Sequence, residues 1–219
     1  MNDEIIIGVV GSGAMGSGIA QVAATAGHKV VLYDADKEAL KSSTEKLRKI
    51  LKRLVEKGTI DEIVSKEIIE RIEYADAINA YKNCGLIIEA IVENPEIKKK
   101  VFREIETIAG NDCILATNTS SLSITSIAAA CSNPSRVIGI HFFNPAPLMP
   151  LVEIIPAVQT SDSIVHRTKT IIYKWGKTTV LAKDTPGFIV NRIARPFYGE
   201  AIRIYEEGIA TVATIDWAM

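Results

Sequence analysis

A short apolar run that ends in closely spaced glycines constrains this 219-residue chain more than any other feature of its sequence. The run Ile5 to Val10 is rich in β-branched residues, and it is followed directly by Gly11-Ser12-Gly13-Ala14-Met15-Gly16. This pattern predicts a buried strand, a tight turn and then a helix over residues 13–26, ended by Gly27. A second strand over residues 29–33 would complete a βαβ unit.

Each glycine of the turn has a physical role in a dinucleotide-binding loop. Gly11 permits the tight turn, Gly13 lets the backbone approach a pyrophosphate, and Gly16 lets the helix pack closely on the strand. The pyrophosphate would lie at the helix N-terminus, where unpaired amide groups point outward. We therefore expect the whole loop to line a cofactor site: Gly11, Ser12, Gly13, Ala14, Met15 and Gly16.

Asp34 stands at the end of the second predicted strand, close to the position expected for a ribose-binding carboxylate. It is expected to accept hydrogen bonds from the adenosine ribose. Its charge would repel a 2′-phosphate, and no arginine follows closely, so the pattern favours NAD over NADP. The alternative is a glycine turn that binds no nucleotide.

A long charged segment over residues 37–72 interrupts the βαβ pattern. Its leucines at 40, 47, 51 and 54 fall on one helical stripe, and Gly58-Thr59 breaks it. The segment predicts a helical hairpin whose second arm is capped by Asp61. It exceeds the length of a normal crossover, so we expect an insertion that covers one edge of the sheet.

The rest of the chain alternates strand and helix patterns, which predicts a parallel, doubly wound sheet. The prolines at 145, 147 and 150 predict an extended loop. The fold class is therefore α/β, a mainly parallel sheet of the Rossmann type. The expected strands are 86–90, 114–117, 137–141, 151–155 and 178–181, and the expected helices are 95–109, 124–130 and 161–175.

Asp184-Thr185-Pro186-Gly187 is typical of a domain boundary. It divides a predicted NAD-binding domain, residues 1–185, from the beginning of a helical domain, residues 186–219. The helix expected over residues 188–207 is apolar around most of its circumference and so requires burial on several sides. Another helix would start near the end of the chain, at Asp216.

The composition excludes several classes of protein. A formal net charge of −1, from 25 basic and 26 acidic residues, argues against nucleic-acid or membrane-surface binding driven by overall charge. The acidic N-terminus and the short apolar run after it predict no secretory signal and no membrane span. The three cysteines, 84, 113 and 131, show no metal-ligand or redox spacing and suit free thiols in a reducing compartment. We expect a cytoplasmic protein without a metal.

His141 and Glu153 are candidates for acid-base chemistry. His141 ends a predicted strand, and in open α/β sheets ligands bind beyond the carboxyl ends of the strands. A histidine there can act as a general base near neutral pH, and Glu153 could fix its tautomer and stabilise the imidazolium. Spacing alone leaves open a buried structural histidine and a surface glutamate.

Five motifs extend this interpretation to a family. They are Gly11-Ser12-Gly13-Ala14-Met15-Gly16-Ser17-Gly18-Ile19-Ala20, Glu89-Ala90-Ile91-Val92-Glu93-Asn94, Asn118-Thr119-Ser120-Ser121-Leu122, His141-Phe142-Phe143-Asn144-Pro145 and Asp184-Thr185-Pro186-Gly187-Phe188-Ile189-Val190-Asn191-Arg192. With these motifs in this order, the chain from Ile5 to Met219 resembles the L-3-hydroxyacyl-CoA dehydrogenases, including the bacterial 3-hydroxybutyryl-CoA dehydrogenases. The resemblance implies NAD-dependent oxidation of a (3S)-3-hydroxyacyl-CoA to the 3-oxoacyl-CoA, or the reverse reduction of acetoacetyl-CoA.

The resemblance also implies residue roles. His141 matches the catalytic base and Glu153 its carboxylate partner. Ser120 and Asn191 match residues that position the substrate. The residues that line the cofactor site are implied to be Glu93, Lys98, Ser120 and Asn144, and the region of Lys57 is implied to contact the CoA moiety.

Each of these positions also has a plain structural interpretation. Ser120 could belong to the turn that caps the next helix, and Asn191 could lie on a helix surface. Lys98 could be one of three solvated lysines at 98–100, and Lys57 could lie on a solvated face of the charged hairpin.

Members of the family continue into a complete helical domain that forms the dimer interface and closes the active-site cleft, and this chain stops within that domain. The resemblance thus implies a homodimer or other homo-oligomer through the C-terminal helices. We expect the helix over residues 188–207 to self-associate, or the chain beyond it to be disordered, because leaving large apolar side chains in water forgoes roughly 1.5–3 kcal/mol each. Three functions stay open: a hydroxyacyl-CoA dehydrogenase, a related dehydrogenase of a small hydroxy or sugar acid, and a catalytically silent NAD-binding fragment.

Overall fold

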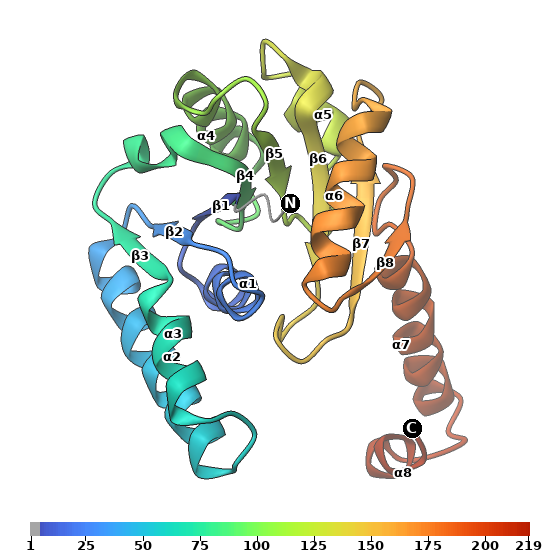
Figure 1. Ribbon diagram of the computed structural model, residues 1–219. Helices are drawn as coiled ribbons and strands as arrows, with labels where there is room; N and C mark the ends of the chain where they lie inside the picture. Colours follow the sequence, from blue (N-terminus) through green and yellow to red (C-terminus); the bar gives the residue numbers. More distant parts are fainter. Residues whose placement is uncertain (1–4) are drawn as a thin grey trace.

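The strands of the chain form one eight-stranded sheet in the order β3-β2-β1-β4-β5-β6-β7-β8 (Figure 1). The computed structural model describes residues 5–219, so the acidic start expected to carry no signal, Met1 to Glu4, lies outside the described residues. The strands are β1 (Ile6–Val10), β2 (Val30–Tyr33), β3 (Ile72–Ala75), β4 (Cys84–Glu89), β5 (Ile114–Thr117), β6 (Val137–Phe142), β7 (Leu151–Pro156) and β8 (Thr178–Leu181).

The strand pairing confirms the predicted doubly wound, mainly parallel sheet. Strands β3, β2, β1, β4, β5 and β6 pair in parallel, whereas β6 and β7 pair antiparallel and β7 and β8 pair in parallel again. The chain winds outward from β1 in one direction to β3 and in the other from β4 to β8. Such a reversal opens a crevice at the carboxyl ends of the central strands, which is where ligands bind in this architecture.

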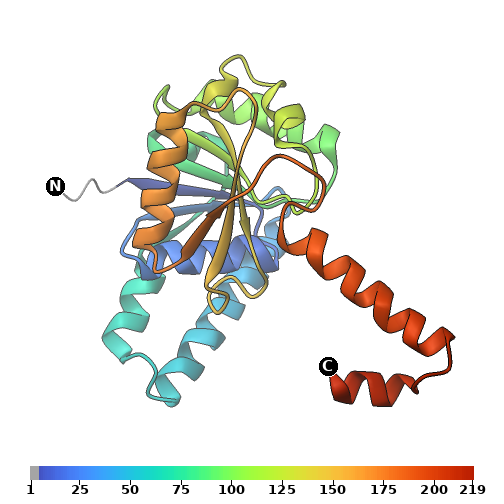
Figure 2. The same cartoon turned by 90° about the vertical axis from the view of Figure 1, so that its right-hand side faces the viewer.

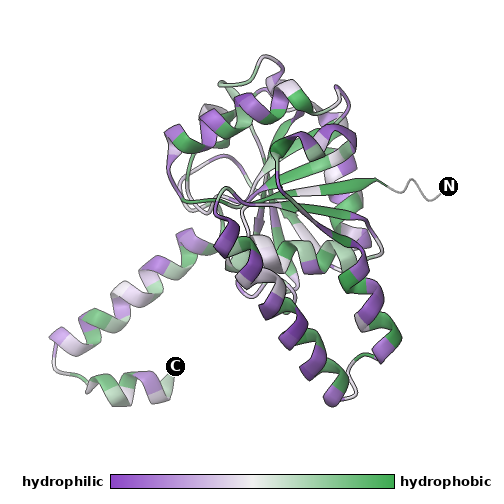
Figure 3. Cartoon of the chain, turned by 90° about the vertical axis from the view of Figure 1, so that its left-hand side faces the viewer, coloured by the Kyte–Doolittle hydropathy of each residue, from purple (hydrophilic) through white to green (hydrophobic). Residues whose placement is uncertain are grey.

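Helices cover both faces of the sheet (Figures 1 and 2). One core lies beneath α1, α2, α3 and α6, and the other lies beneath α4 and α5. Both cores are filled by the β-branched and aliphatic residues of the strands, which are hydrophobic along most of their length (Figure 3). The helices of the sandwich are α1 (Ala14–Thr25), α2 (Lys37–Glu56), α3 (Glu62–Glu70), α4 (Pro95–Ile108), α5 (Ile124–Ala128) and α6 (Asp162–Lys174).

The charged segment forms the predicted hairpin of α2 and α3. Leu40, Leu47 and Leu51 are buried, and Asp61 caps α3 by accepting a hydrogen bond of 2.8 Å from the amide of Val64. The expectation that the hairpin covers a sheet edge is wrong. The hairpin packs on α1. The edge of the sheet is formed by β3, which begins at the last residue of the expected hairpin range and which the sequence pattern did not indicate.

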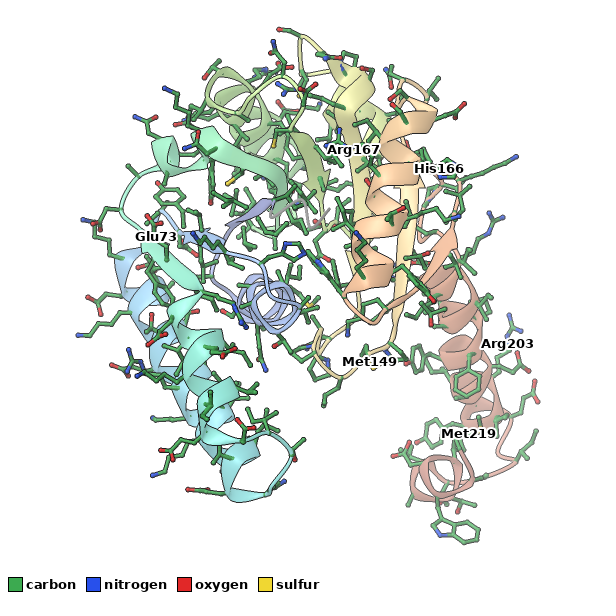
Figure 4. All side chains as sticks on the ribbon, viewed as in Figure 1. Glu73, Met149, His166, Arg167, Arg203 and Met219 are labelled. Atoms are coloured by element: carbon green, nitrogen blue, oxygen red, sulfur yellow. The ribbon has the colours of Figure 1, made fainter. Side chains whose placement is uncertain are left out.

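The loop between β6 and β7 is folded back rather than extended as the prolines predicted. The amides of Leu148 and Met149 both donate to the carbonyl oxygen of Pro145, which makes a turn. Lys177 is buried beside it and donates to the carbonyl oxygens of Ala146, at 2.6 Å, and of Met149, at 2.8 Å. Met149 is labelled on this loop in Figure 4.

The last two helices, α7 (Val190–Glu206) and α8 (Val212–Ala218), leave the sandwich as an arm (Figures 1 and 2). None of the residues in these two ranges is buried. Helix α7 therefore has no cover within the described residues, and the expectation that it self-associates stays a prediction. Helix α8 begins four residues earlier than the expected start at Asp216, because Thr211 caps it through the amide of Thr214.

Candidate active site

The polar side chains that follow β1, β4, β5 and β6 meet at one edge of the sheet. These four strands are neighbours and run in parallel, so their carboxyl ends open into the same crevice. The predicted cofactor loop follows β1, Glu93 follows β4, Ser120 follows β5, and His141 is the penultimate residue of β6. The fold therefore brings the principal candidates together.

The glycine loop has the geometry that close approach of a phosphate requires. Gly11 has φ of 97°, a conformation that favours glycine. A Cβ atom added at Gly16 would lie 1.8 Å from the carbonyl oxygen of Gly11, so the contact of α1 with the loop needs a glycine. Nothing lies within 4 Å of a Cβ built at Gly13, the residue that precedes α1. The loop thus leaves open space in front of the helix N-terminus, where Ala14 and Met15 begin the helix.

Asp34 lies next to this loop, as predicted. Its carboxylate accepts hydrogen bonds from the amide of Ser12, at 2.6 Å, and from the Ser12 hydroxyl, at 2.8 Å. Its other oxygen accepts from the amide of Asp36. The carboxylate therefore joins the end of β2 to the loop and lies where the ribose of a dinucleotide would be recognised.

His141 and Glu153 form a buried pair. The two residues lie directly opposite each other in the antiparallel ladder of β6 and β7, and Nδ1 of His141 is 2.7 Å from Oε2 of Glu153. A carboxylate accepts hydrogen bonds, so this contact suits an imidazole that donates from Nδ1 and leaves Nε2 as the ring nitrogen available to a ligand. The imidazole ring is packed against Phe143 and Phe188, with centroids 4.5 and 5.7 Å away.

The second oxygen of Glu153 lies at the start of the arm. Oε1 accepts hydrogen bonds from the amides of Ile189, at 2.9 Å, and Val190, at 3.0 Å. These are unpaired donors at the N-terminus of α7, a helix that has no side-chain cap of its own. Phe188, just before them, has φ of 48°, which is unusual for a residue with a bulky side chain and turns the chain toward the dyad.

A pocket of about 400 Å³ opens in front of His141. Six predicted site residues line it besides His141: Met15, Glu93, Lys98, Ser120, Asn144 and Asn191. Asn191 also donates a hydrogen bond of 3.4 Å to the carbonyl oxygen of Ser120. The interpretation of Asn191 as a plain helix-surface residue is therefore wrong. Ser120 does not cap α5, because the cap is Ser123. The pocket is lined by Met15, Ala90, Ile91, Glu93, Lys98, Asn118, Ser120, His141, Phe142, Phe143, Asn144 and Asn191.

Glu93 and Lys98 meet at the base of this pocket. The Lys98 ammonium is 3.2 Å from a Glu93 oxygen and is only 1% exposed, so it is not one of three solvated lysines. Burial alone would raise the pKa of Glu93. A hydrogen bond from Thr119, the charge of Lys98 and the amide of Ser120 outweigh this effect and hold the Glu93 pKa below its ordinary value.

Sequence reasoning missed Glu89 and Asn118 as site residues. Glu89, at the end of β4, is fully buried and accepts a hydrogen bond of 2.6 Å from Lys98. Asn118 accepts one of 2.9 Å from the amide of Phe142 and so joins the ends of β5 and β6. Both lie in the quoted motifs, but their roles depend on tertiary neighbours that spacing does not reveal.

Lys57 lies in a second, larger pocket of about 690 Å³ between α1, α2 and the loop after β6. Lys46, Arg53 and Lys57 line it, and the described residues of its lining include no carboxylate. The rest of its lining combines apolar side chains, such as Leu47 and Ile50, with polar ones, such as Gln21 and Ser43. Asn144 lines both pockets, so they adjoin at that residue.

Three further findings concern metal binding, membrane spans and cysteines in residues 5–219. No group of three or more histidine, cysteine, aspartate or glutamate side chains in this range could hold a metal ion. No helix in the range combines the length and the apolar character needed to cross a membrane. All three cysteines, Cys84, Cys113 and Cys131, are free and buried, and burial raises the pKa of each thiol.

The sheet, the glycine loop with Asp34 and the pocket around His141 define a dinucleotide-binding α/β protein of the dehydrogenase class. The sequence matches two family profiles. Residues 6–185 match that of the 3-hydroxyacyl-CoA dehydrogenase, NAD binding domain, and residues 187–219 match that of the 3-hydroxyacyl-CoA dehydrogenase, C-terminal domain.

Individual relatives agree with these profiles. The chain is 43% identical to a 3-hydroxyadipyl-CoA dehydrogenase of Escherichia coli and 43% identical to a 3-hydroxybutyryl-CoA dehydrogenase of Bradyrhizobium diazoefficiens. Each alignment covers 97% of this chain, but 45% of the first relative and 73% of the second. The crystal structure of (S)-3-hydroxybutyryl-CoA dehydrogenase from Ralstonia eutropha superposes with a TM-score of 0.93 at 38% identity, over 97% of this chain and 75% of that one.

The chain belongs to the 3-hydroxyacyl-CoA dehydrogenase family, and residues 6–185 match the NAD-binding domain of that family. The resemblance inferred from the five motifs, the fold class and the preference for NAD are thereby confirmed.

Proposed function

We propose that this protein catalyses NAD-dependent oxidation of a (3S)-3-hydroxyacyl-CoA to the 3-oxoacyl-CoA, and the reverse reduction. The observation that carries the proposal is the His141–Glu153 pair, held at 2.7 Å beside a pocket that reaches the glycine loop at Met15. An acid-base histidine next to a dinucleotide loop suits transfer of a proton and a hydride from one carbinol group.

In the oxidation, Nε2 of His141 removes the proton of the 3-hydroxyl group. When bound, NAD supplies the hydride acceptor for C3. Glu153, fully buried, stabilises the imidazolium that forms and holds the ring in one tautomer. In the reduction, the imidazolium donates its proton to the ketone oxygen.

Ser120 and Asn191 are proposed to orient the substrate. Ser120 faces the pocket from the loop after β5 and Asn191 from the arm, and they are joined by a hydrogen bond. Two elements far apart in the sequence thus converge on the space in front of His141, which suits positioning of the hydroxyl and thioester groups for reaction. Glu93, Lys98 and Asn144 are proposed to line the nicotinamide part of the site.

The larger pocket is proposed to bind the nucleotide part of CoA. CoA carries several phosphate groups, and Lys46, Arg53 and Lys57 supply positive charge to a lining without carboxylates among the described residues. The larger pocket also includes Ser12, Gly13 and Ala14 of the glycine loop, so CoA is proposed to occupy only its α2 side and to leave the loop to the dinucleotide. The two pockets adjoin at Asn144, so an acyl chain can extend from there toward His141.

We further propose that the protein forms a homodimer or other homo-oligomer through α7 and α8, with a division of the chain near residue 185. Ile193, Phe197 and Ile202 are 51–69% exposed on α7, and covering them would be favourable. Sedimentation analysis tests this proposal, since a monomer at micromolar concentration would contradict it. We place the protein in the cytoplasm, whose reducing conditions suit three free thiols.

The decisive experiment is oxidation of NADH with acetoacetyl-CoA by this chain and by a His141→Gln variant. We expect turnover by the wild type and loss of turnover in the variant, with NADH still bound by both. Normal turnover by the variant would overturn the role of His141. Binding of NADH without turnover by the wild type would favour a catalytically silent NAD-binding fragment, and turnover only with small hydroxy or sugar acids would favour the related dehydrogenase.

A further inference from the structure

The carboxylate of Glu89 is fully buried and has no part in the proposed proton and hydride transfer, yet both of its oxygens accept hydrogen bonds. Oε1 accepts hydrogen bonds from Lys98 Nζ, at 2.6 Å, and from the amide of Ile91, at 2.7 Å. Oε2 accepts one of 2.7 Å from the hydroxyl of Thr117. Isolated buried carboxylates are costly, so a position at the end of β4 that keeps one has a use for its charge or its geometry.

Lys98 connects this hidden carboxylate to the pocket. Its ammonium lies between Glu89 and Glu93, at 2.6 and 3.2 Å, and is 1% exposed. Glu93 in turn is 39% exposed and accepts a hydrogen bond of 3.0 Å from the amide of Ser120. The three charged groups therefore form one chain, from the interior of the sheet to the wall of the pocket that also contains His141.

The net charge of this cluster follows from its composition. Glu89 and Lys98 together are neutral whichever of the two holds the shared proton. Glu93 is ionised at neutral pH, since its pKa lies below the ordinary value. The cluster therefore carries about one negative charge, and it would be neutral without Glu89.

A negative charge in this place discriminates between the two forms of a nicotinamide ring. The oxidised ring carries a positive charge and the reduced ring is neutral. A fixed charge of −1 within reach of the ring favours the oxidised form, and it does so more strongly in a partly buried site than in water.

We propose that Glu89 is a positioning residue that, through Lys98 and Glu93, sets the preference of the pocket for oxidised over reduced nicotinamide. This inference rests on the proposed function, because it requires a dinucleotide whose nicotinamide lies in the His141 pocket. Glu89 itself does not touch the cofactor; it holds Lys98 in place and supplies the charge that makes the cluster negative.

The test measures dissociation constants for NAD+ and for NADH, by isothermal titration, with wild type and Glu89→Gln. The quantity compared is the ratio of the NAD+ constant to the NADH constant. Loss of a unit charge near the ring, at an effective dielectric constant of about 20, predicts a rise of this ratio on the order of tenfold in the variant.

Three further variants separate charge from structure. Glu89→Asp keeps the charge and should keep the wild-type ratio. Thr117→Val removes a partner of Glu89 without removing charge, and should change both constants by the same factor. Glu93→Gln removes the same net charge from a half-exposed position, so it should raise the ratio even if Glu89→Gln does not fold.

Equal weakening of NAD+ and NADH binding in Glu89→Gln and in Glu93→Gln would overturn the inference and leave Glu89 a packing residue. The proposed function would then stand. Failure of the wild type to bind either form would overturn both together.

Discussion

Glu153 shares its carboxylate between His141 and the first turn of the arm. One oxygen is 2.7 Å from Nδ1 of His141, and the other accepts the amides of Ile189 and Val190. The side chain that orients the base is therefore also the cap of α7, the helix that brings Asn191 to the pocket. A single group therefore contributes both to the position of the arm and to the orientation of the imidazole.

Replacement of Glu153 by Gln should separate these two roles. The amide oxygen can still accept hydrogen bonds from the start of α7, but a neutral group stabilises the imidazolium poorly. We expect kcat to fall by a factor on the order of 10²–10⁴, with little change in the dissociation constant of NADH. Steady-state kinetics and NADH titration provide the measurement.

Glu106→Gln is a matched control for this experiment. Glu106 also accepts two backbone amides, those of Ser132 and Asn133, but it does not line the His141 pocket. Its variant should keep the wild-type kcat. An equal loss of kcat in both variants would mean that Glu153 acts through the fold rather than through His141.

Alanine substitutions at two glycines of the loop should affect different properties: Gly16→Ala the stability of the fold, and Gly13→Ala the binding of NADH. A Cβ at Gly16 would meet the backbone oxygen of Gly11 at 1.8 Å, so Gly16→Ala should destabilise the fold by about 1–3 kcal/mol or more. A Cβ at Gly13 meets nothing within 4 Å, so Gly13→Ala should cost at most about 1 kcal/mol, as a poorer helix cap.

Gly13→Ala should nevertheless weaken NADH binding, because the new methyl group projects into the space left for a pyrophosphate. Thermal unfolding and NADH titration of both variants provide the comparison. Unimpaired NADH binding by Gly13→Ala would place the pyrophosphate elsewhere.

How well the sequence predicts a strand depends on whether turn-forming residues flank it. Strands β5 and β8 have the predicted bounds, since turn-forming residues isolate short β-branched runs at both positions. Strand β3 was missed because Ile72–Ala75 follows α3 after Arg71 alone, without a glycine or proline between them. A strand at a sheet edge also needs only weak hydrophobicity, and Glu73 in its centre is exposed.

The site was predictable to the extent that its residues lie at strand ends in recognisable motifs. His141 and Glu153 were paired from the motif order, but their direct opposition depends on the antiparallel turn between β6 and β7. Glu89 could not be identified in this way. A buried carboxylate at this position needs the charge of Lys98 beside it. Glu89 and Lys98 are nine positions apart in the sequence, and they come into contact only when α4 packs on the end of β4.

Removing positive charge from the larger pocket should weaken acyl-CoA binding. Arg53→Ala and Lys46→Ala should each raise the KM for acetoacetyl-CoA about fivefold, the effect of about 1 kcal/mol, and leave NADH binding unchanged. Lys57→Ala should do so less, since Lys57 lies beyond the last residue of α2. Lys52→Ala, on the same helix but outside the pocket lining, is the control. An equal rise in KM for Lys52→Ala would point to a general effect of charge.

Asp184, in the segment that precedes α7, should make the free energy of unfolding depend on pH. Its carboxylate accepts hydrogen bonds from the amides of Ile124 and Thr125 and from the hydroxyl of Ser123, and thereby holds this segment on the start of α5. Burial alone would raise the pKa of Asp184, but these hydrogen bonds, with that of Thr125 foremost, lower it below the ordinary value of 3.8.

A carboxyl group whose pKa is lower in the folded state stabilises the fold when it is ionised. The stabilisation is complete above pH 3.8 and is lost as the pH falls through the lower, folded value. Asp184→Asn should therefore reduce the urea midpoint at pH 7, while the difference from wild type should shrink toward pH 3. A difference that stayed constant from pH 7 to pH 3 would show that geometry, not the charge of Asp184, attaches this segment to α5.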